Sequence, residues 1–122
     1  MAITATPTKA YITSRMIKQT VVNNTPDGDV TGTNATIYTL DLNNTHSQTA
    51  YFKIYDIGAV TYGTDAPDIV IPVAAAQRQV VTIVEGITMT TCVTWAASQG
   101  AGTTSGSILS GGAFVAIATV ID

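Results

Sequence analysis

The chain carries little charge. Of its 122 residues, 5 are Lys or Arg and 8 are Asp or Glu, so that 11% are charged, against roughly 25% in a typical soluble domain. The net charge is −3, and the cations are widely scattered, at Lys9, Arg15, Lys18, Lys53 and Arg78. Because binding to a phosphate backbone requires a clustered basic face, we predict that the protein does not bind nucleic acid.

Cysteine and histidine each occur once. A single cysteine, Cys92, cannot form a disulfide within the chain, so the fold does not depend on disulfides and is compatible with a reducing compartment. One histidine and one cysteine are too few for the common zinc sites. Cys92 lies between Thr91 and Val93 with no histidine or cation nearby in the sequence. We therefore expect a buried thiol that behaves as a small hydrophobic side chain.

Long apolar runs are also missing. Residues 1–9 have neither a charged n-region nor a long apolar run, so we expect no secretory signal there. Residues 86–121 carry no charge, but their last apolar stretch, residues 113–121, is far shorter than the roughly 20 residues that a membrane-spanning helix needs. The sequence predicts a soluble protein that does not associate with membranes.

β-Branched residues are abundant. The chain has 22 Thr, 13 Ile and 12 Val, but only 3 Leu and 1 Glu. β-Branched side chains are stiff at χ1 and suit the pleated, half-buried surface of a strand. More than a third of the residues are of this kind, which predicts an all-β protein without a long helix.

The apolar runs and the turn residues between them indicate about seven strands. Two antiparallel sheets packed face to face would bury their apolar faces, so we predict a single-domain β-sandwich, Greek-key or jelly-roll-like. Residues 1–9 are predicted to be an extended N-terminal arm, and residues 10–122 the sandwich domain. The predicted strands are residues 11–22, 36–42, 50–56, 68–73, 79–85, 87–95 and 113–121.

Alternation along these strands predicts which side chains face the core. In residues 36–42 the even-numbered side chains form one mostly apolar face. In residues 50–56, Phe52 and Ile54 point to one side. Residues 113–121 are apolar on both faces, which predicts burial by a second sheet on one face and by a partner chain on the other.

We predict no catalytic, cofactor-binding or metal-binding residues, and therefore no enzyme. A Ser-His-Asp triad would have to use His46 with Asp41, but the chain has no Gly-x-Ser-x-Gly elbow. His46 lies in a polar Asn/Thr connection, where we expect a solvated side chain.

The closest carboxylate pairs are Asp27 with Asp29 and Asp65 with Asp68. Nothing in the sequence marks either pair as glycosidase carboxylates, and neither belongs to a calcium loop of the twelve-residue type. Aspartates in turns usually accept hydrogen bonds from their own backbone, and we expect that role here.

Trp95, Tyr51, Tyr55 and Tyr62 admit two interpretations. They could form an aromatic platform for a sugar, as in a lectin-like module. Alternatively, these rings plug the edges of the core or of an interface, which we favour.

The low charge admits two interpretations. Threonine and serine hydroxyls can hydrate a surface without charge, or much of the surface contacts protein. Interface cores are depleted in Lys, Glu and Asp, and permanent interfaces are the more apolar ones. The candidate contact segments are the arm of residues 1–9, the loop of residues 23–34 and the loop of residues 98–112.

Several stretches in the middle of the chain resemble a known group of proteins. They are AYFKIYD at residues 50–56, GTDAPDIVIPV at residues 63–73 and VVTIVEGITM at residues 80–89, followed by a tail rich in Thr, Gly and Ser. In this order they resemble small structural proteins of tailed bacteriophages, of the head-decoration or capsid-cement type.

The resemblance implies a β-sandwich that sits on the outside of an icosahedral shell and clamps neighbouring capsomers. Its partners would be the major capsid protein and further copies of itself, in a homotrimer rather than a dimer. The protein would be made in the host cytoplasm and end in the virion. The alternatives are a virion protein of the tail, neck or fibre, and a carbohydrate-binding sandwich.

Overall fold

The computed structural model describes residues 15–26, 34–103 and 111–121. Within these residues the chain forms strands and no helix, which confirms the all-β prediction. The strands are β1 (Arg15–Gln19), β2 (Ala35–Asn44), β3 (Ala50–Tyr55), β4 (Ile69–Val73), β5 (Gln77–Met89), β6 (Thr94–Ser98) and β7 (Phe114–Ile121).

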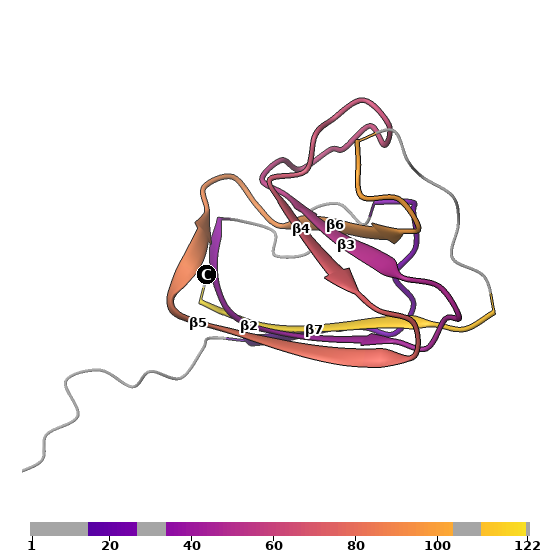
Figure 1. Ribbon diagram of the computed structural model, residues 1–122. Coiled ribbons are helices and arrows are strands. Elements are labelled where there is room, and N and C mark those ends of the chain that lie inside the picture. The colour runs from indigo at the N-terminus through magenta and orange to yellow at the C-terminus, as the bar shows by residue number, and fades with distance from the viewer. Residues whose placement is uncertain (1–14, 27–33, 104–110, 122) are drawn as a thin grey trace, which may run out of the picture.

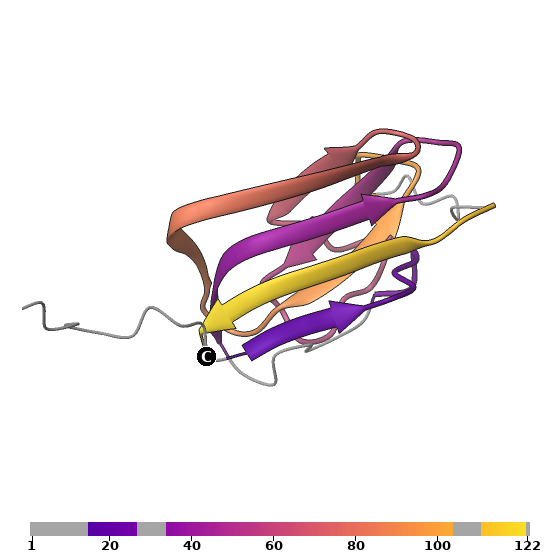
Figure 2. The same cartoon turned by 90° about the horizontal axis from the view of Figure 1, so that it is seen from below.

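The strands form two sheets packed face to face (Figures 1 and 2). The large sheet has the order β1-β7-β2-β5, and the small sheet has the order β4-β3-β6. Every pairing in both sheets is antiparallel. The predicted antiparallel β-sandwich is therefore confirmed.

Each strand before the connection between β3 and β4 pairs with a strand after it, in reverse order along the chain. β3 pairs with β4, β2 with β5, and β1 with β7. Between the last two pairs, the N–H of Ala97 on β6 donates to the carbonyl of Asn23 at 2.9 Å. The chain thus resembles one long hairpin, folded so that β7 lies beside β2 and β6 beside β3. This is the winding of a jelly roll, here with seven strands instead of eight.

The segment that follows β1 passes from the large sheet to the small one. The N–H of Val22 donates to the carbonyl of Phe114 on β7, and the next residue, Asn23, bonds to β6. β1 therefore ends at Gln19, earlier than the strand predicted over residues 11–22. Residues 11–14 of that prediction lie outside the described part of the chain.

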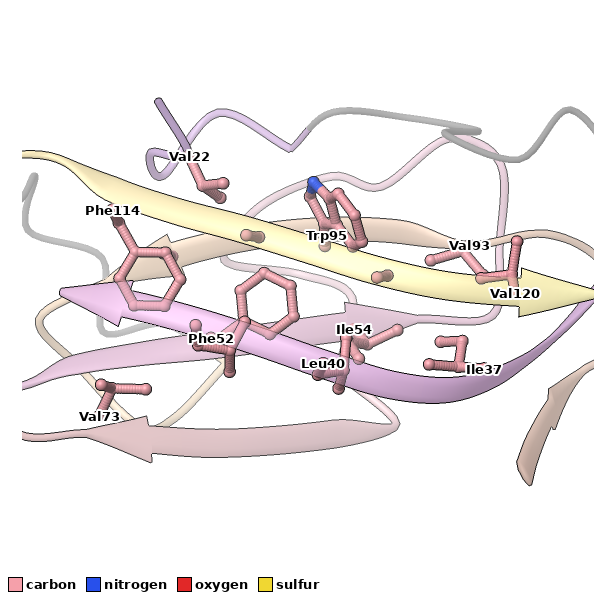
Figure 3. Close-up of a cluster of buried hydrophobic side chains, with 14 of the residues drawn as sticks. Val22, Ile37, Leu40, Phe52, Ile54, Val73, Val93, Trp95, Phe114 and Val120 are labelled. Carbon is pink, nitrogen blue, oxygen red and sulfur yellow. The ribbon is translucent and has the colours of Figure 1, made fainter. Parts of the chain in front are cut away.

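Three aromatic rings lie at the centre of the core between the sheets (Figure 3). Phe52 of β3 stacks on Phe114 of β7, with ring centroids 5.6 Å apart, and tilts against Trp95 of β6 at 5.4 Å. The indole N–H of Trp95 donates to Oε1 of Gln19 on β1 at 2.6 Å. The predicted inner face of Phe52 and Ile54 is confirmed, because both side chains are buried in this core.

Strand β2 contains an irregularity at Tyr38. Ile37 pairs with Ile87 of β5, and Thr39 pairs with Thr82, so that Tyr38 alone lies opposite the four β5 residues between positions 82 and 87. Tyr38 is also an extra residue relative to β7. Extra residues of this kind bend a strand and increase its twist.

The irregularity changes which side chains of β2 face the core. Ile37 is buried together with Leu40 and Leu42, whereas Tyr38 is half-buried. The prediction that the even-numbered side chains of residues 36–42 form the inner face is therefore right after Tyr38 and wrong before it. A strand without the extra residue would have turned Ile37 away from the core.

Gly86 does not end a strand. The sequence predicts two strands here, residues 79–85 and 87–95, whereas β5 runs without a break from Gln77 to Met89 and β6 begins only at Thr94. Gly86 has φ +76°, a conformation that glycine adopts without a steric penalty. At its C-terminal end, β5 turns toward the small sheet (Figure 1).

We predict that Gly86→Ala destabilises the fold by about 2–4 kcal/mol, from left-handed backbone strain together with overpacking. A Cβ at this position would lie 2.3 Å from Cγ2 of Thr36 and 3.1 Å from the Tyr38 ring. The control is Gly63→Ala, because Gly63 has φ +88° but a Cβ added there would have no atom within 4 Å. It should cost only about 1 kcal/mol. Equal losses in urea unfolding would contradict the packing role of Gly86.

Candidate interaction surface

The outer face of the small sheet is covered by the chain itself. Lys53 and Tyr55 of β3 point away from the aromatic core, and yet both are fully buried, as are Thr94 and Ser98 of β6. The hydroxyl of Thr94 donates to the carbonyl of Ile57, just beyond β3. The segments that follow β3 and β6 therefore fold back over this face.

Lys53 forms hydrogen bonds to both of the segments that cover this face. Its Nζ donates to the carbonyl of Gly102 at 2.6 Å and to the hydroxyl of Tyr62 at 3.2 Å. The same ammonium lies 5.1 Å from the centroid of the Tyr62 ring, within the range of a cation–π interaction. A buried lysine is costly unless it is bonded, and here the bonds hold two loops against the sheet.

We predict that Lys53→Met loosens the two covering segments more than it destabilises the whole fold. Methionine fills a similar volume but cannot bond to Gly102 or Tyr62. Hydrogen exchange measured by mass spectrometry should become faster in residues 57–63 and 99–103, with Lys18→Met on the exposed β1 as the control. Unchanged exchange in both segments would show that Lys53 does not hold them.

Asp56, directly after β3, holds the connection between β5 and β6. Its carboxylate accepts hydrogen bonds from the N–H and hydroxyl of Thr90 and from the N–H groups of Thr91 and Cys92. Partial burial raises the pKa of Asp56, but the bonds from Thr91 and Thr90 outweigh it, so the pKa lies below its usual range.

The low pKa of Asp56 predicts a pH dependence. A carboxyl group whose pKa is lower in the folded than in the unfolded chain stabilises the fold fully above the unfolded pKa of about 3.9, and this stabilisation is lost as the pH falls through the folded pKa. Asp56→Asn should therefore cost about 2 kcal/mol near pH 6 and less near pH 3.

The measurement for Asp56 is urea unfolding at both pH values. Asp65→Asn is the control, because within the described residues the Asp65 carboxylate accepts one backbone bond, from Thr61, and the substitution should cost less. A loss for Asp56→Asn that is the same at pH 6 and pH 3 would contradict the stabilising role of the ionised carboxylate.

The outer face of the large sheet is different, because no described segment crosses in front of it (Figure 2). Its side chains form cross-strand rows on the surface. We call this surface the open face. It consists of Met16, Lys18, Thr39, Asp41, Arg78, Val80, Thr82, Ile117 and Thr119.

The open face combines apolar side chains, hydroxyl groups and an ion pair. Met16 is 65% exposed and Val80 58%. The hydroxyls of Thr39 and Thr119 bond to each other across β2 and β7. Asp41 pairs with Arg78, and the guanidinium, which bonds to it and attracts it, holds the pKa of that carboxyl below its usual range. Such a mixed, weakly charged surface is typical of protein contacts.

The structure corrects the prediction for His46. The side chain is only 4% exposed rather than solvated. The backbone N–H of His46 donates to the side chain of Asn44, and its carbonyl accepts from Ala76. A Cβ on Gly112 would lie 2.8 Å from the His46 nitrogen, so the chain packs tightly here. Asp41 belongs to the open face and bonds to Arg78.

Asp65 and Cys92 behave as predicted, whereas Asp68 bonds to backbone outside its own turn. Asp65 accepts a bond from the backbone of Thr61, and Asp68 accepts one from the backbone of Asp56. Cys92 is buried. Asp27 and Asp29 lie outside the described residues. In the described part of the chain, no group of three or more His, Cys, Asp or Glu side chains could hold a metal ion.

The aromatic residues do not form the sugar platform that one interpretation predicted. Trp95 and Tyr55 are fully buried, and Tyr51 and Tyr62 are half-buried. Burial raises the pKa of Tyr55 to about 12, with smaller contributions from the nearby Tyr62 and Asp65. Trp95 fills the core, which agrees with the alternative that these rings plug the core.

The predicted contact segments are described only in part. The arm of residues 1–9 lies outside the described residues, and so do residues 27–33 and 104–110 of the two loops. The second apolar face predicted for residues 113–121 is the part of the open face that β7 contributes, whereas the contributions of β1, β2 and β5 and the roles of Lys53 and Asp56 were not predicted. The bonds of Lys53 and Asp56 to distant loops leave no signal in the local sequence pattern.

Comparison with known proteins identifies no family. No protein-family model matches the chain, and no curated protein and no solved structure matches it significantly. A search of the described residues for a helix long and apolar enough to cross a membrane found none.

Proposed function

We propose that the protein is a structural virion protein of a tailed bacteriophage, a decoration or cement protein that binds the outside of the head and bridges capsomers. Its partners would be the major capsid protein and further copies of itself, as a trimer. It would be made in the host cytoplasm and act in the virion without catalysis. The observation that carries this proposal is the open face.

The open face supports the proposal by its chemistry. It places Met16, Val80 and Ile117 on one surface with threonine hydroxyls. Its charged groups are the ion pair of Asp41 with Arg78, which neutralise each other, and Lys18. Burying such a surface removes apolar area from water and leaves few charges to desolvate. The resemblance of residues 50–56, 63–73 and 80–89 to phage head proteins adds the kind of partner.

The stabilising effect follows from linkage. A protein that binds the assembled shell but not its separated subunits stabilises the assembled state in proportion to its binding free energy. A small sandwich present at many equivalent positions would add this contribution at each of them. It needs no pocket, metal or cofactor for this role.

The experiment compares phage heads with and without the protein. Heads that lack it should release their DNA at a lower temperature, and purified protein added back should restore the wild-type release temperature. Equal heat stability of the two kinds of head would contradict the proposal.

Two variants test the role of the open face. Val80→Lys introduces a charge on the open face and should fail to restore heat stability. Val70→Lys is the matched control, because Val70 is an exposed apolar residue of the small sheet, and this variant should restore it. Both must first show the wild-type circular dichroism spectrum. Full restoration by Val80→Lys would exclude the open face as the contact with the shell.

A further inference from the structure

Two strands lie at the edges of the large sheet as the described residues form it. β1 and β5 are the outermost strands in its order, and among the described residues each pairs on one side only, β1 with β7 and β5 with β2. An outer strand presents a row of backbone N–H and C=O groups that can pair with another chain. Natural proteins protect such edges or use them.

The two edges carry the most exposed apolar side chains of the described residues. Val84 of β5 is 90% exposed and Met16 of β1 is 65% exposed. Val84 is one of the four β5 residues that face Tyr38 alone, so β2 does not pair with it in register. Both side chains would be removed from water if the two edges met.

The edges also carry opposite charge. β1 contains Arg15 and Lys18 and no acidic residue. β5 contains Glu85, which is exposed, and Arg78, which is paired with Asp41. Complementary charge of this kind guides two surfaces into register and disfavours like edges meeting.

We propose that β1 of one copy of this chain pairs with β5 of the next, so that the large sheet continues from copy to copy. β1 and β5 run in opposite directions, because three antiparallel pairings separate them. Copies placed side by side with their strands aligned would therefore join by a further antiparallel pairing.

One register of this pairing places opposite charges next to each other and keeps inward-pointing residues opposite inward-pointing ones. It places Arg15 opposite Glu85 of the next copy, and Met16 opposite its Val84. Ile17 then lies opposite Ile83. Ile17 and Val81 both pack against the core. Side chains two residues apart point to the same face of a strand, so Ile83 points inward like Val81. Met16 and Val84 then both point to the outer face of the sheet.

The pairing is heterologous, since each copy uses one edge to bind and the other to be bound. Such an interface gives a closed ring when the rotation between copies closes, and a trimer is one such ring. The inference concerns contacts between copies only and does not depend on the proposed binding to a phage head.

Disulfide cross-linking tests the pairing directly. Directly opposite residues in antiparallel strands have Cα atoms about 4.5–5.5 Å apart, within the range of a disulfide. In a Cys92→Ala background, the double variant Met16→Cys with Val84→Cys should form covalent oligomers under mild oxidation. Each single variant should remain uncross-linked. Within one chain β1 and β5 are three strand spacings apart, about 14 Å, so the two positions cannot link.

Each other outcome overturns the proposal. Cross-linking of Val84→Cys alone would show that β5 pairs with β5, and cross-linking of Met16→Cys alone would show that β1 pairs with β1. A double variant that stays monomeric while folded would show that the edges do not meet.

Charge exchange provides an independent test by analytical ultracentrifugation. Arg15→Glu and Glu85→Arg should each weaken self-association by about tenfold or more, because like charges would then face each other. The double variant that carries both substitutions should recover most of the wild-type association. A wild-type chain that remains monomeric, or single variants that associate normally, would contradict the proposal. A self-associating protein that does not protect heads would leave it intact and overturn only the proposed function.

Discussion

The packing of Phe52 against rings from both sheets is the interaction on which the rest of the fold depends. Phe114 belongs to the large sheet and Trp95 to the small one, so Phe52 joins the two layers in one aromatic cluster. Gln19 accepts the indole N–H of Trp95 and thereby connects β1 to the same cluster. With only 3 Leu in the chain, much of the remaining core consists of smaller Val, Ile and Ala side chains.

The outer faces of the two sheets differ in how they are covered. The small sheet is covered by its own loops, and Lys53 and Thr94 beneath them bond to the loop carbonyls of Gly102 and Ile57. The large sheet has no comparable cover among the described residues, and its surface combines apolar and hydroxyl side chains. This asymmetry supports the proposed role in assembly, because in that role a partner would cover the open face.

Sequence patterns could predict the fold class, the strand number and the inner faces of β3 and β7, since these follow from two-residue alternation. Alternation could not predict the irregularity at Tyr38, where one residue of β2 faces four of β5. It could not predict the burial of His46 either, because that depends on Asn44, whose amide bonds to the carbonyls of Val73 and Ala74 about thirty positions away. Such long-range bonds decide where a polar residue lies, and single-sequence patterns do not contain them.

The most direct test of the proposed role is the number of copies of this chain in purified phage particles. Particles banded on a density gradient can be analysed by quantitative mass spectrometry, with the chain measured against the major shell protein. A decoration protein requires many copies, in a simple ratio to the shell subunit that also gives its symmetry position. A handful of copies would place the protein in the tail or neck instead, and its absence from the particles would contradict the virion role altogether.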